Sequence, residues 1–140
     1  MNDLNQSNNE TICKQLFDEF RGILSWKWDD WIGTFLAELD TAKEKTVRTI
    51  LEKHLPIYWD NSNINTAPQV VRALDEHLGG LRSTQFLFSS NPSNDVFVFC
   101  AWWPWGNGMT ISLRIAPFNE SLSNPEEEKL IEQLKVLAGI

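Results

Sequence analysis

The residues with the strongest capacity for recognition lie in one run, residues 95–118, which reads DVFVFCAWWPWGNGMTISLRIAPF. Alternate residues of a strand point to opposite faces, so a hairpin here would gather several aromatic side chains beside one basic residue, Arg114. Aromatic and Arg side chains are enriched among the residues that dominate binding energy at protein interfaces. The run therefore indicates a partner-binding or ligand-binding site, for which seven residues are candidates: Phe97, Phe99, Trp103, Trp105, Arg114, Ser112 and Thr110.

The same run contains the clearest hairpin signal in the chain, because Asn107-Gly108 suits a turn that needs positive φ at both central positions. The pairs that this turn predicts are Trp105 with Thr110, Trp103 with Ser112, and Ala101 with Arg114. A turn at Gly106-Asn107 would shift the pairing by two residues and keep the same faces, whereas a three-residue loop would exchange the faces. One face of the hairpin is then apolar on both strands, whereas the other has aromatic residues on its first strand and a mixed second strand. Three explanations fit this second face: a second layer of helices covers it, two copies associate through it, or it lines a binding concavity.

The end of the hairpin has a different character from its middle. Pro104 lacks a backbone N–H, and proline in sheets is confined to edges, strand ends and bulges. The segment from Trp102 to Gly108 is therefore expected either to project or to cap a pocket. A projecting apolar segment of this kind is typical of a partner-binding surface.

Catalytic and metal-binding patterns are not found in the sequence. His54 and His77 lie on separate expected helices, and no Cys or second His stands at metal-ligand spacing from either. Cys13 and Cys100 lie on the apolar sides of their elements, where a thiol packs as a small hydrophobic group. We therefore assign no catalytic residue, no metal ligand and no cofactor.

Charge and composition restrict the class of partner. The chain has 19 acidic and 12 basic residues, a formal net charge of −7, whereas nucleic-acid binding needs a dense Lys/Arg footprint. An acidic surface instead suits a basic protein, although it also serves solubility alone. No apolar run is long enough to span a membrane, and the first residues do not resemble a signal peptide. We expect no nucleic-acid or membrane partner and a cytoplasmic location.

Hydrophobic periodicity predicts an α+β fold in a single globular domain, residues 1–140. A helical half covers about residues 8–81, within which residues 29–55 fit either one helix or two. A three-stranded antiparallel β-meander follows over about residues 82–118, with strands at 82–89, 95–103 and 109–118. A C-terminal helix over about residues 125–138 is expected to pack on this meander.

These patterns favour a non-enzymatic, cytosolic protein-binding or adaptor domain, similar in size and charge to inhibitor, immunity or chaperone proteins. It would bind a protein, either a basic partner or a second copy of itself, through the aromatic hairpin face and an acidic surface. The alternative is a small-molecule-binding protein or an enzyme with a pocket between the hairpin and the helices. Its polar anchors would be Arg114, Ser112, Thr110 and Tyr58.

Overall fold

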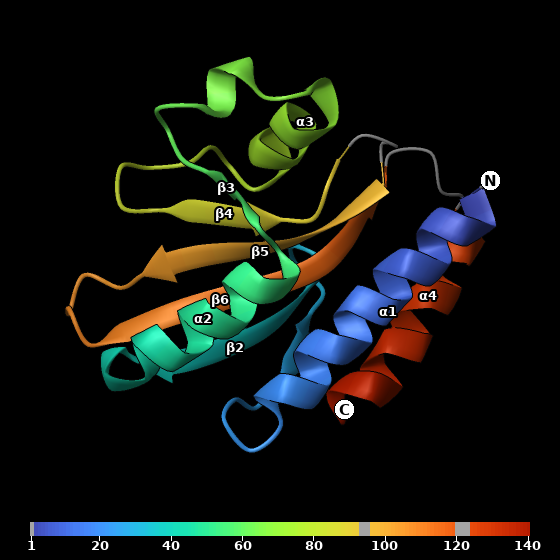
Figure 1. Ribbon diagram of the computed structural model, residues 1–140, viewed down its shortest axis with the longest axis horizontal. Helices are drawn as coiled ribbons and strands as arrows, with labels where there is room; N and C mark the ends of the chain where they lie inside the picture. Colours follow the sequence, from blue (N-terminus) through green and yellow to red (C-terminus); the bar gives the residue numbers. More distant parts are fainter. Residues whose placement is uncertain (1, 93–95, 120–123) are drawn as a thin grey trace.

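A six-stranded antiparallel sheet forms the centre of the protein (Figure 1). The computed structural model describes residues 2–92, 96–119 and 124–140. The strand order is β1-β2-β6-β5-β4-β3, which places the two longest strands in the middle. The strands are β1 (Lys27–Asp29), β2 (Thr34–Asp40), β3 (Ile57–Trp59), β4 (Phe86–Ser89), β5 (Val96–Pro104) and β6 (Thr110–Asn119).

The prediction of a three-stranded meander was wrong, because the sheet has six strands and extends on both sides of the expected three. The largest error lies in residues 29–55: the helix expected in their second part is present as α2 (Glu44–His54), but the helix expected before Asp40 is not. Their first part forms β2, which pairs with β6 from Phe35 opposite Ile115 to Asp40 opposite Thr110. In β2, Phe35, Ala37 and Leu39 alternate with more exposed residues and are buried. Apolar residues here fit both the helical and the strand period, and pairing with β6 decided between them.

Two short edge strands complete the sheet, and both were missed for the same reason. β1 and β3 have three residues each, too few to show a periodicity. β1 pairs with β2, and β3 pairs with β4. Short edge strands present few unpaired backbone groups, which limits edge-to-edge association.

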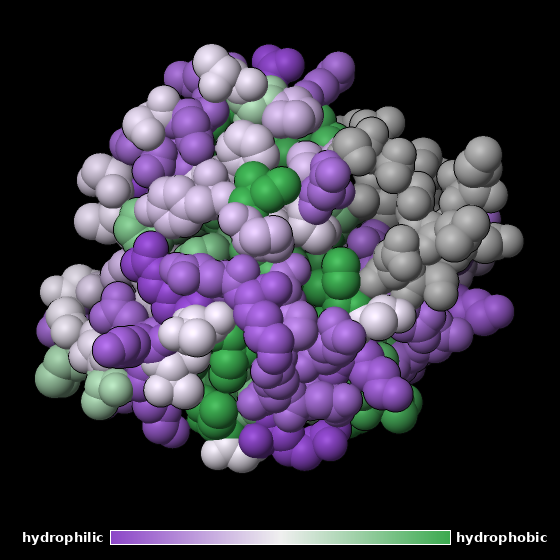
Figure 2. Space-filling model, in the orientation of Figure 1, coloured by the Kyte–Doolittle hydropathy of each residue, from purple (hydrophilic) through white to green (hydrophobic). Residues whose placement is uncertain are grey.

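Helices cover the sheet unequally on its two faces. Three of them, α1 (Asn2–Phe20), α2 (Glu44–His54) and α4 (Asn124–Ala138), pack on the first face; α1 and α4 lie side by side (Figure 1). The expected N-terminal and C-terminal helices are thus confirmed. Their shared core includes the buried residues Phe17, Phe20, Leu51, Phe88, Trp102, Leu113, Ile115 and Leu134. The outward surface of these helices is mostly hydrophilic (Figure 2).

Among the described residues, one α-helix packs on the second face, α3 (Gln69–His77), assisted by the short 3₁₀ helix η2 (Ile64–Thr66). A further 3₁₀ helix, η1 (Thr41–Lys43), leads into α2. The core under α3 contains Val70, Val71, Leu74, Leu87, Phe97, Phe99, Ala101 and Ala116. These sheet residues come mainly from β4 and β5, so α3 covers one half of the second face.

The register of the β5–β6 hairpin agrees with the sequence prediction. Ala101 pairs with Arg114 and Trp103 pairs with Ser112. The loop is longer than the expected two-residue turn: Trp105 N–H donates to the Thr110 carbonyl at 2.8 Å, which leaves residues 106–109 as the loop. Gly108 has a φ of +71°, a conformation that favours glycine. Asp95, where we expected β5 to begin, lies outside the described residues.

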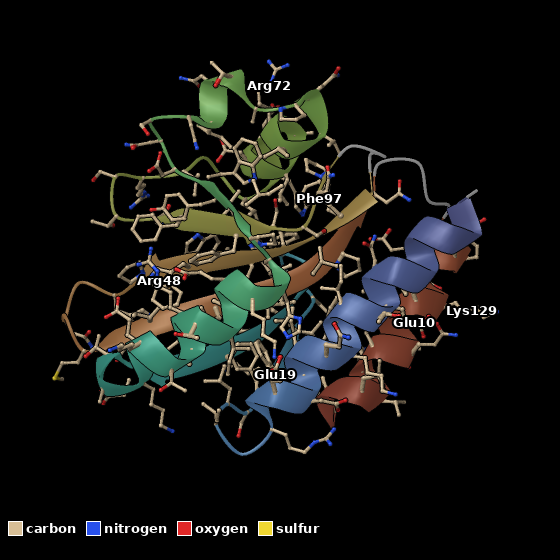
Figure 3. All side chains as sticks on the ribbon, in the orientation of Figure 1. Glu10, Glu19, Arg48, Arg72, Phe97 and Lys129 are labelled. Atoms are coloured by element: carbon tan, nitrogen blue, oxygen red, sulfur yellow. The ribbon has the colours of Figure 1, made fainter. Side chains whose placement is uncertain are left out.

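A charged contact joins α1 to α2 across the first face. Glu19 Oε2 pairs with His54 Nε2, and Glu19 Oε1 lies 3.0 Å from Lys53 Nζ. Figure 3 shows Glu19 on the side of α1 that faces α2. The hydrogen bond from His54, followed by that from Lys53, lowers the pKa of the Glu19 carboxyl below its ordinary value. His54 therefore has a structural role, because its contact with Glu19 joins α2 to α1.

Candidate functional site

The seven candidate residues divide into two groups in the structure. Phe97 and Phe99 are buried at 0% and 2% exposure under α3, so they belong to the core (Figure 3). The other five lie at or beyond the edge of the area that α3 covers: Trp103 is partly buried against the same core, and the remaining four lie outside that core. We call this surface the open face; together with two β2 residues it comprises Leu36, Glu38, Trp103, Trp105, Thr110, Ser112 and Arg114. All seven retain solvent exposure.

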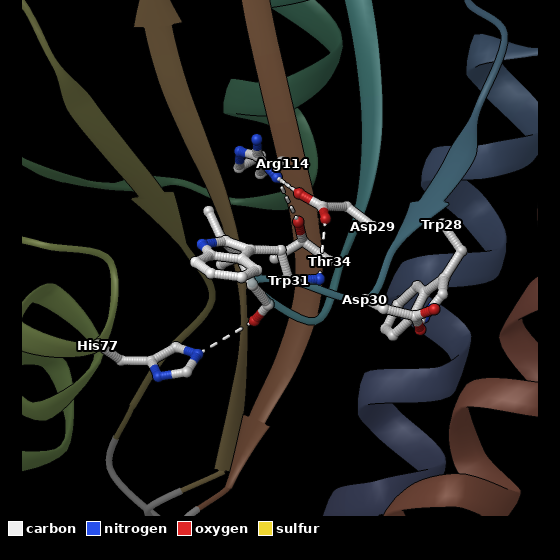
Figure 4. Close-up of polar contacts among 8 residues, drawn as sticks. Trp28, Asp29, Asp30, Trp31, Thr34, His77 and Arg114 are labelled. Carbon is white, nitrogen blue, oxygen red and sulfur yellow. Dashed lines mark hydrogen bonds and ion pairs between the residues drawn. The ribbon is translucent and has the colours of Figure 1, made fainter.

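Arg114 organises the centre of the open face. Its Nη1 pairs with Asp29 Oδ2 of β1 and lies 3.2 Å from Thr34 Oγ1 of β2, to which it donates (Figure 4). Its guanidinium lies 5.0 Å from the centre of the Trp103 ring. Arg114 therefore holds three neighbouring strands and one aromatic platform in fixed relative positions.

The charge of Arg114 is compensated within the protein. The hydrogen bond from Arg114 lowers the pKa of the Asp29 carboxyl, and the backbone N–H of Trp31 adds to this effect. The two side chains are only 14% and 21% exposed. Arg114 consequently acts as a support for Trp103 rather than as a free cation that could bind an anionic ligand.

Two polar atoms beside this network have no hydrogen-bond partner among the described residues. They are the indole Nε1 of Trp103 and the Nε of Arg114, and both atoms are buried. A buried donor without an acceptor is energetically unfavourable. Both donors are closed to solvent, so they cost stability without offering a contact to a ligand at the surface.

The hairpin end forms the second aromatic part of the open face. Trp105 donates from Nε1 to Ser112 Oγ at 2.8 Å, yet the residue remains 45% exposed. The Asn107 side chain fixes the loop, because its Oδ1 accepts hydrogen bonds from the backbone N–H groups of Met109 and Thr110. Trp105 is therefore both exposed and held in place, which reduces the conformational entropy lost on binding.

Trp31 was not predicted as a site residue, yet it is the most exposed aromatic side chain among the described residues, at 93%. It lies in the β1–β2 turn, and a hydrogen bond on each side of Trp31 holds this turn in place. The Trp31 N–H donates to Asp29 Oδ1 at 2.9 Å, and His77 Nε2 of α3 lies 3.1 Å from the Ile32 carbonyl, to which it donates. In Figure 4 the Trp31 ring lies between Arg114 and His77. The turn signal Asp29-Asp30-Trp31-Ile32-Gly33 was present, but the segment fitted a helix as well.

Acidic side chains accompany these aromatic residues on β2. Glu38 and Asp40 are exposed and, by the alternation of the strand, point to the second face with Leu36. Lys27, opposite Leu36 on β1, is a nearby basic residue. The open face thus combines an aromatic centre with an acidic edge.

The remaining reactive side chains have structural roles. Cys13 and Cys100 are both 0% exposed, as predicted, and burial raises the pKa of the Cys13 thiol to about 12. Such thiols are not nucleophiles at neutral pH. Within the described ranges, no three His, Cys, Asp or Glu residues are grouped so that they could hold a metal ion, and no helix has the length and apolar character needed to cross a membrane.

The Asp29–Arg114 pair predicts how stability depends on pH. Because the pKa of Asp29 lies below its ordinary value of 3.8 in the folded protein, its ionised form stabilises the fold at neutral pH. This contribution is lost as pH falls from about 5 through the folded pKa. We expect Asp29→Asn to reduce the loss of stability between pH 7 and pH 3, measured by urea unfolding. An unchanged loss in Asp29→Asn would contradict the role of this pair; Asp18→Asn, an exposed acid on α1, is the matched control.

No family model, curated protein or solved structure matches this chain. The function is therefore argued from the residues of the open face and their geometry.

Proposed function

We propose that this protein is a binding domain that docks a partner protein on the open face. The observation that carries the proposal is the unequal covering of the sheet: α3 buries Phe97 and Phe99, whereas Trp103 is only partly buried and Trp105 is exposed. Rigidly held aromatic side chains next to an Arg are the residue types that dominate binding energy at interfaces. The supporting hydrogen bonds of Trp105 and the Arg114 network are of the kind that limits the entropy lost when a partner binds.

The partner that fits this surface is a protein with a basic face. The open face has Glu38 within it and Asp40 at its edge, and the chain as a whole has a net charge of −7. Complementary charge increases the rate of association and orients the partner. Two buried free thiols are compatible with a reducing compartment, so we place this interaction in the cytoplasm.

Site-specific photocrosslinking tests the docking face. A photoreactive amino acid replaces Leu36 in the open face or, as the matched control, Val136, which is 77% exposed on α4. We expect the Leu36 variant, expressed in the source cells, to crosslink to one basic protein and the Val136 variant to give no such product. Crosslinking only from Val136 would contradict the proposal. A crosslinked dimer of this chain would identify a second copy as the occupant and would contradict the basic partner.

Two substitutions test the surface once the crosslinked protein has been purified. We expect Trp105→Ala and Glu38→Lys each to weaken its binding about tenfold or more, because they remove an aromatic anchor and reverse a complementary charge. Glu38 is exposed, so Glu38→Lys should leave the melting temperature nearly constant, whereas Trp105→Ala also removes the hydrogen bond to Ser112 and should lower it by a few degrees. Val136→Ala is the control for affinity, measured by calorimetry. Equal affinities for all variants would show that the partner docks elsewhere.

A further inference from the structure

A groove of about 430 Å³ lies at the end of the hairpin, on the side of Trp105 that belongs to the first face. The start of α2, the approach to β4 and the ends of β5 and β6 enclose it. Its principal walls are Phe86, Trp102, Pro104, Trp105 and Ile111, and Glu44 is its one charged lining residue among those described. Figure 2 shows pale and light green atoms, with some hydrophilic atoms among them, at the left edge, where this hairpin ends in Figure 1.

The lining of the groove has the chemistry of an organic-cation site. Phe86 and Trp105 are its partly exposed aromatic side chains, with the nearly buried Trp102 behind them, and aromatic rings attract ammonium and guanidinium groups through their negative faces. The carboxylate of Glu44 adds a complementary charge, and no Lys or Arg lines the groove among the described residues. An anionic ligand would instead meet the Glu44 carboxylate, and a purely apolar ligand would leave that carboxylate in a less polar environment.

The protein itself places a guanidinium against one of these rings. The guanidinium carbon of Arg48, one helical turn after Glu44, lies 5.9 Å from the centre of the Phe86 ring and 5.8 Å from that of Phe88. Figure 3 shows Arg48 extending from α2 toward these strands. Arg48 Nε pairs with Glu52 Oε1 at 2.9 Å, so a carboxylate offsets part of its charge beside the groove. Phe86 thus belongs both to an internal cation–aromatic contact and to the groove wall.

We propose that this groove receives an Arg or Lys side chain of the basic partner that docks on the open face. Trp105 connects the two surfaces, because it lines the groove and also donates to Ser112 on the open face. A partner that covers the open face therefore reaches the groove around the hairpin end. This inference rests on the proposed function for its occupant, and it adds the side chain that the partner must supply and the place where that side chain binds.

A short peptide tests the groove without the partner. The probe is acetyl-Gly-Arg-Gly-amide, and its control replaces Arg with citrulline, which has nearly the same shape but no charge. Indole N–H resonances report the binding, with Trp105 lining the groove and Trp31 in the β1–β2 turn as the remote reference. We expect saturable shifts of Trp105 with the Arg peptide, a constant Trp31 signal and an affinity at least threefold lower for the citrulline peptide. Equal affinity for the two peptides, or no shift of Trp105, would overturn the inference.

A matched pair of variants tests the carboxylate. We expect Glu44→Gln to weaken binding of the Arg peptide about two- to fivefold, the range of a partly exposed ion pair. Glu76→Gln removes the same charge from an exposed position on α3 and should leave the affinity unchanged. If both variants weaken binding equally, the peptide senses net charge alone and the groove is not the site.

The two proposals fail in different experiments. If Leu36 crosslinks to a basic protein but the Arg peptide does not shift the Trp105 resonance, the proposed docking on the open face stands and the proposed side-chain site in the groove is wrong. Peptide binding in the groove without crosslinking at Leu36 would overturn the docking face, and with it the assignment of a partner side chain as the occupant. In the purified complex, Glu44→Gln should weaken the partner about two- to fivefold as it weakens the peptide; an unchanged affinity would also overturn the inference.

Discussion

Phe97→Ala is expected to lower the free energy of unfolding by about 3–5 kcal/mol, the usual effect of removing a buried aromatic side chain. Phe97 is 0% exposed in the core under α3, and its ring lies 5.8 Å from that of Phe118 in an edge-to-face contact. Its removal would leave a cavity between the sheet and α3 that the surrounding residues fill only in part. Urea unfolding followed by circular dichroism gives the difference.

Trp31→Ala provides the contrast, because Trp31 is 93% exposed and its side chain contributes little packing. We expect a change within about 0.5 kcal/mol. A loss below about 1 kcal/mol for Phe97→Ala would mean that α3 does not cover this part of the sheet. Phe97 would then belong to the binding surface together with Trp103.

Arg114→Met is expected to lower the free energy of unfolding by about 2–3 kcal/mol, toward the lower end for a broken buried ion pair because both partners keep some solvent contact. The substitution leaves Asp29 without its cation and removes the guanidinium that lies 5.0 Å from the Trp103 ring. The methionine keeps part of the aliphatic packing of the arginine. The loss therefore reports mainly the charged network.

A double-mutant cycle with Asp29→Asn separates the pair from its surroundings. We expect the double variant to be more stable than the sum of the single effects predicts, by about 1 kcal/mol or more, because the two side chains interact directly. Additive effects would show that Arg114 stabilises the protein without Asp29. The indole N–H resonance of Trp103 should also move in Arg114→Met and remain near its position in Asp18→Asn.

The hairpin is the part of the fold that the sequence predicted most accurately. The favoured Asn107-Gly108 turn predicted the observed pairs of Ala101 with Arg114 and Trp103 with Ser112, although a Gly106-Asn107 turn also fitted the sequence. Registers are well determined by pattern, because a shift of one residue would move every apolar side chain to the other face. The N-terminal and C-terminal helices were likewise predicted from long apolar stripes with polar residues opposite.

The segment of Thr34–Asp40 shows why the rest of the sheet was not predicted. Its apolar residues fit helical spacing through Phe35, Leu36 and Leu39, and strand spacing through Phe35, Ala37 and Leu39. A stretch of seven residues cannot distinguish these periods. The open edge of β6 supplies the backbone hydrogen bonds that select the strand, and this edge lies about 75 residues further along the chain.

The candidate site, like the fold, was predicted from the sequence only in part. The sequence by itself determined which residues share a hairpin face, because strand geometry fixes the direction of successive side chains. Whether that face is core or surface depended on where α3 packs, and α3 meets the hairpin only in the folded chain. The tertiary structure therefore assigned Phe97 and Phe99 to the core and left Trp103, Trp105 and Arg114 on the open face. The tertiary structure also placed Trp31 near Arg114 of the open face and Glu44 in the lining of the groove. Nothing in the sequence around either residue indicates these neighbours.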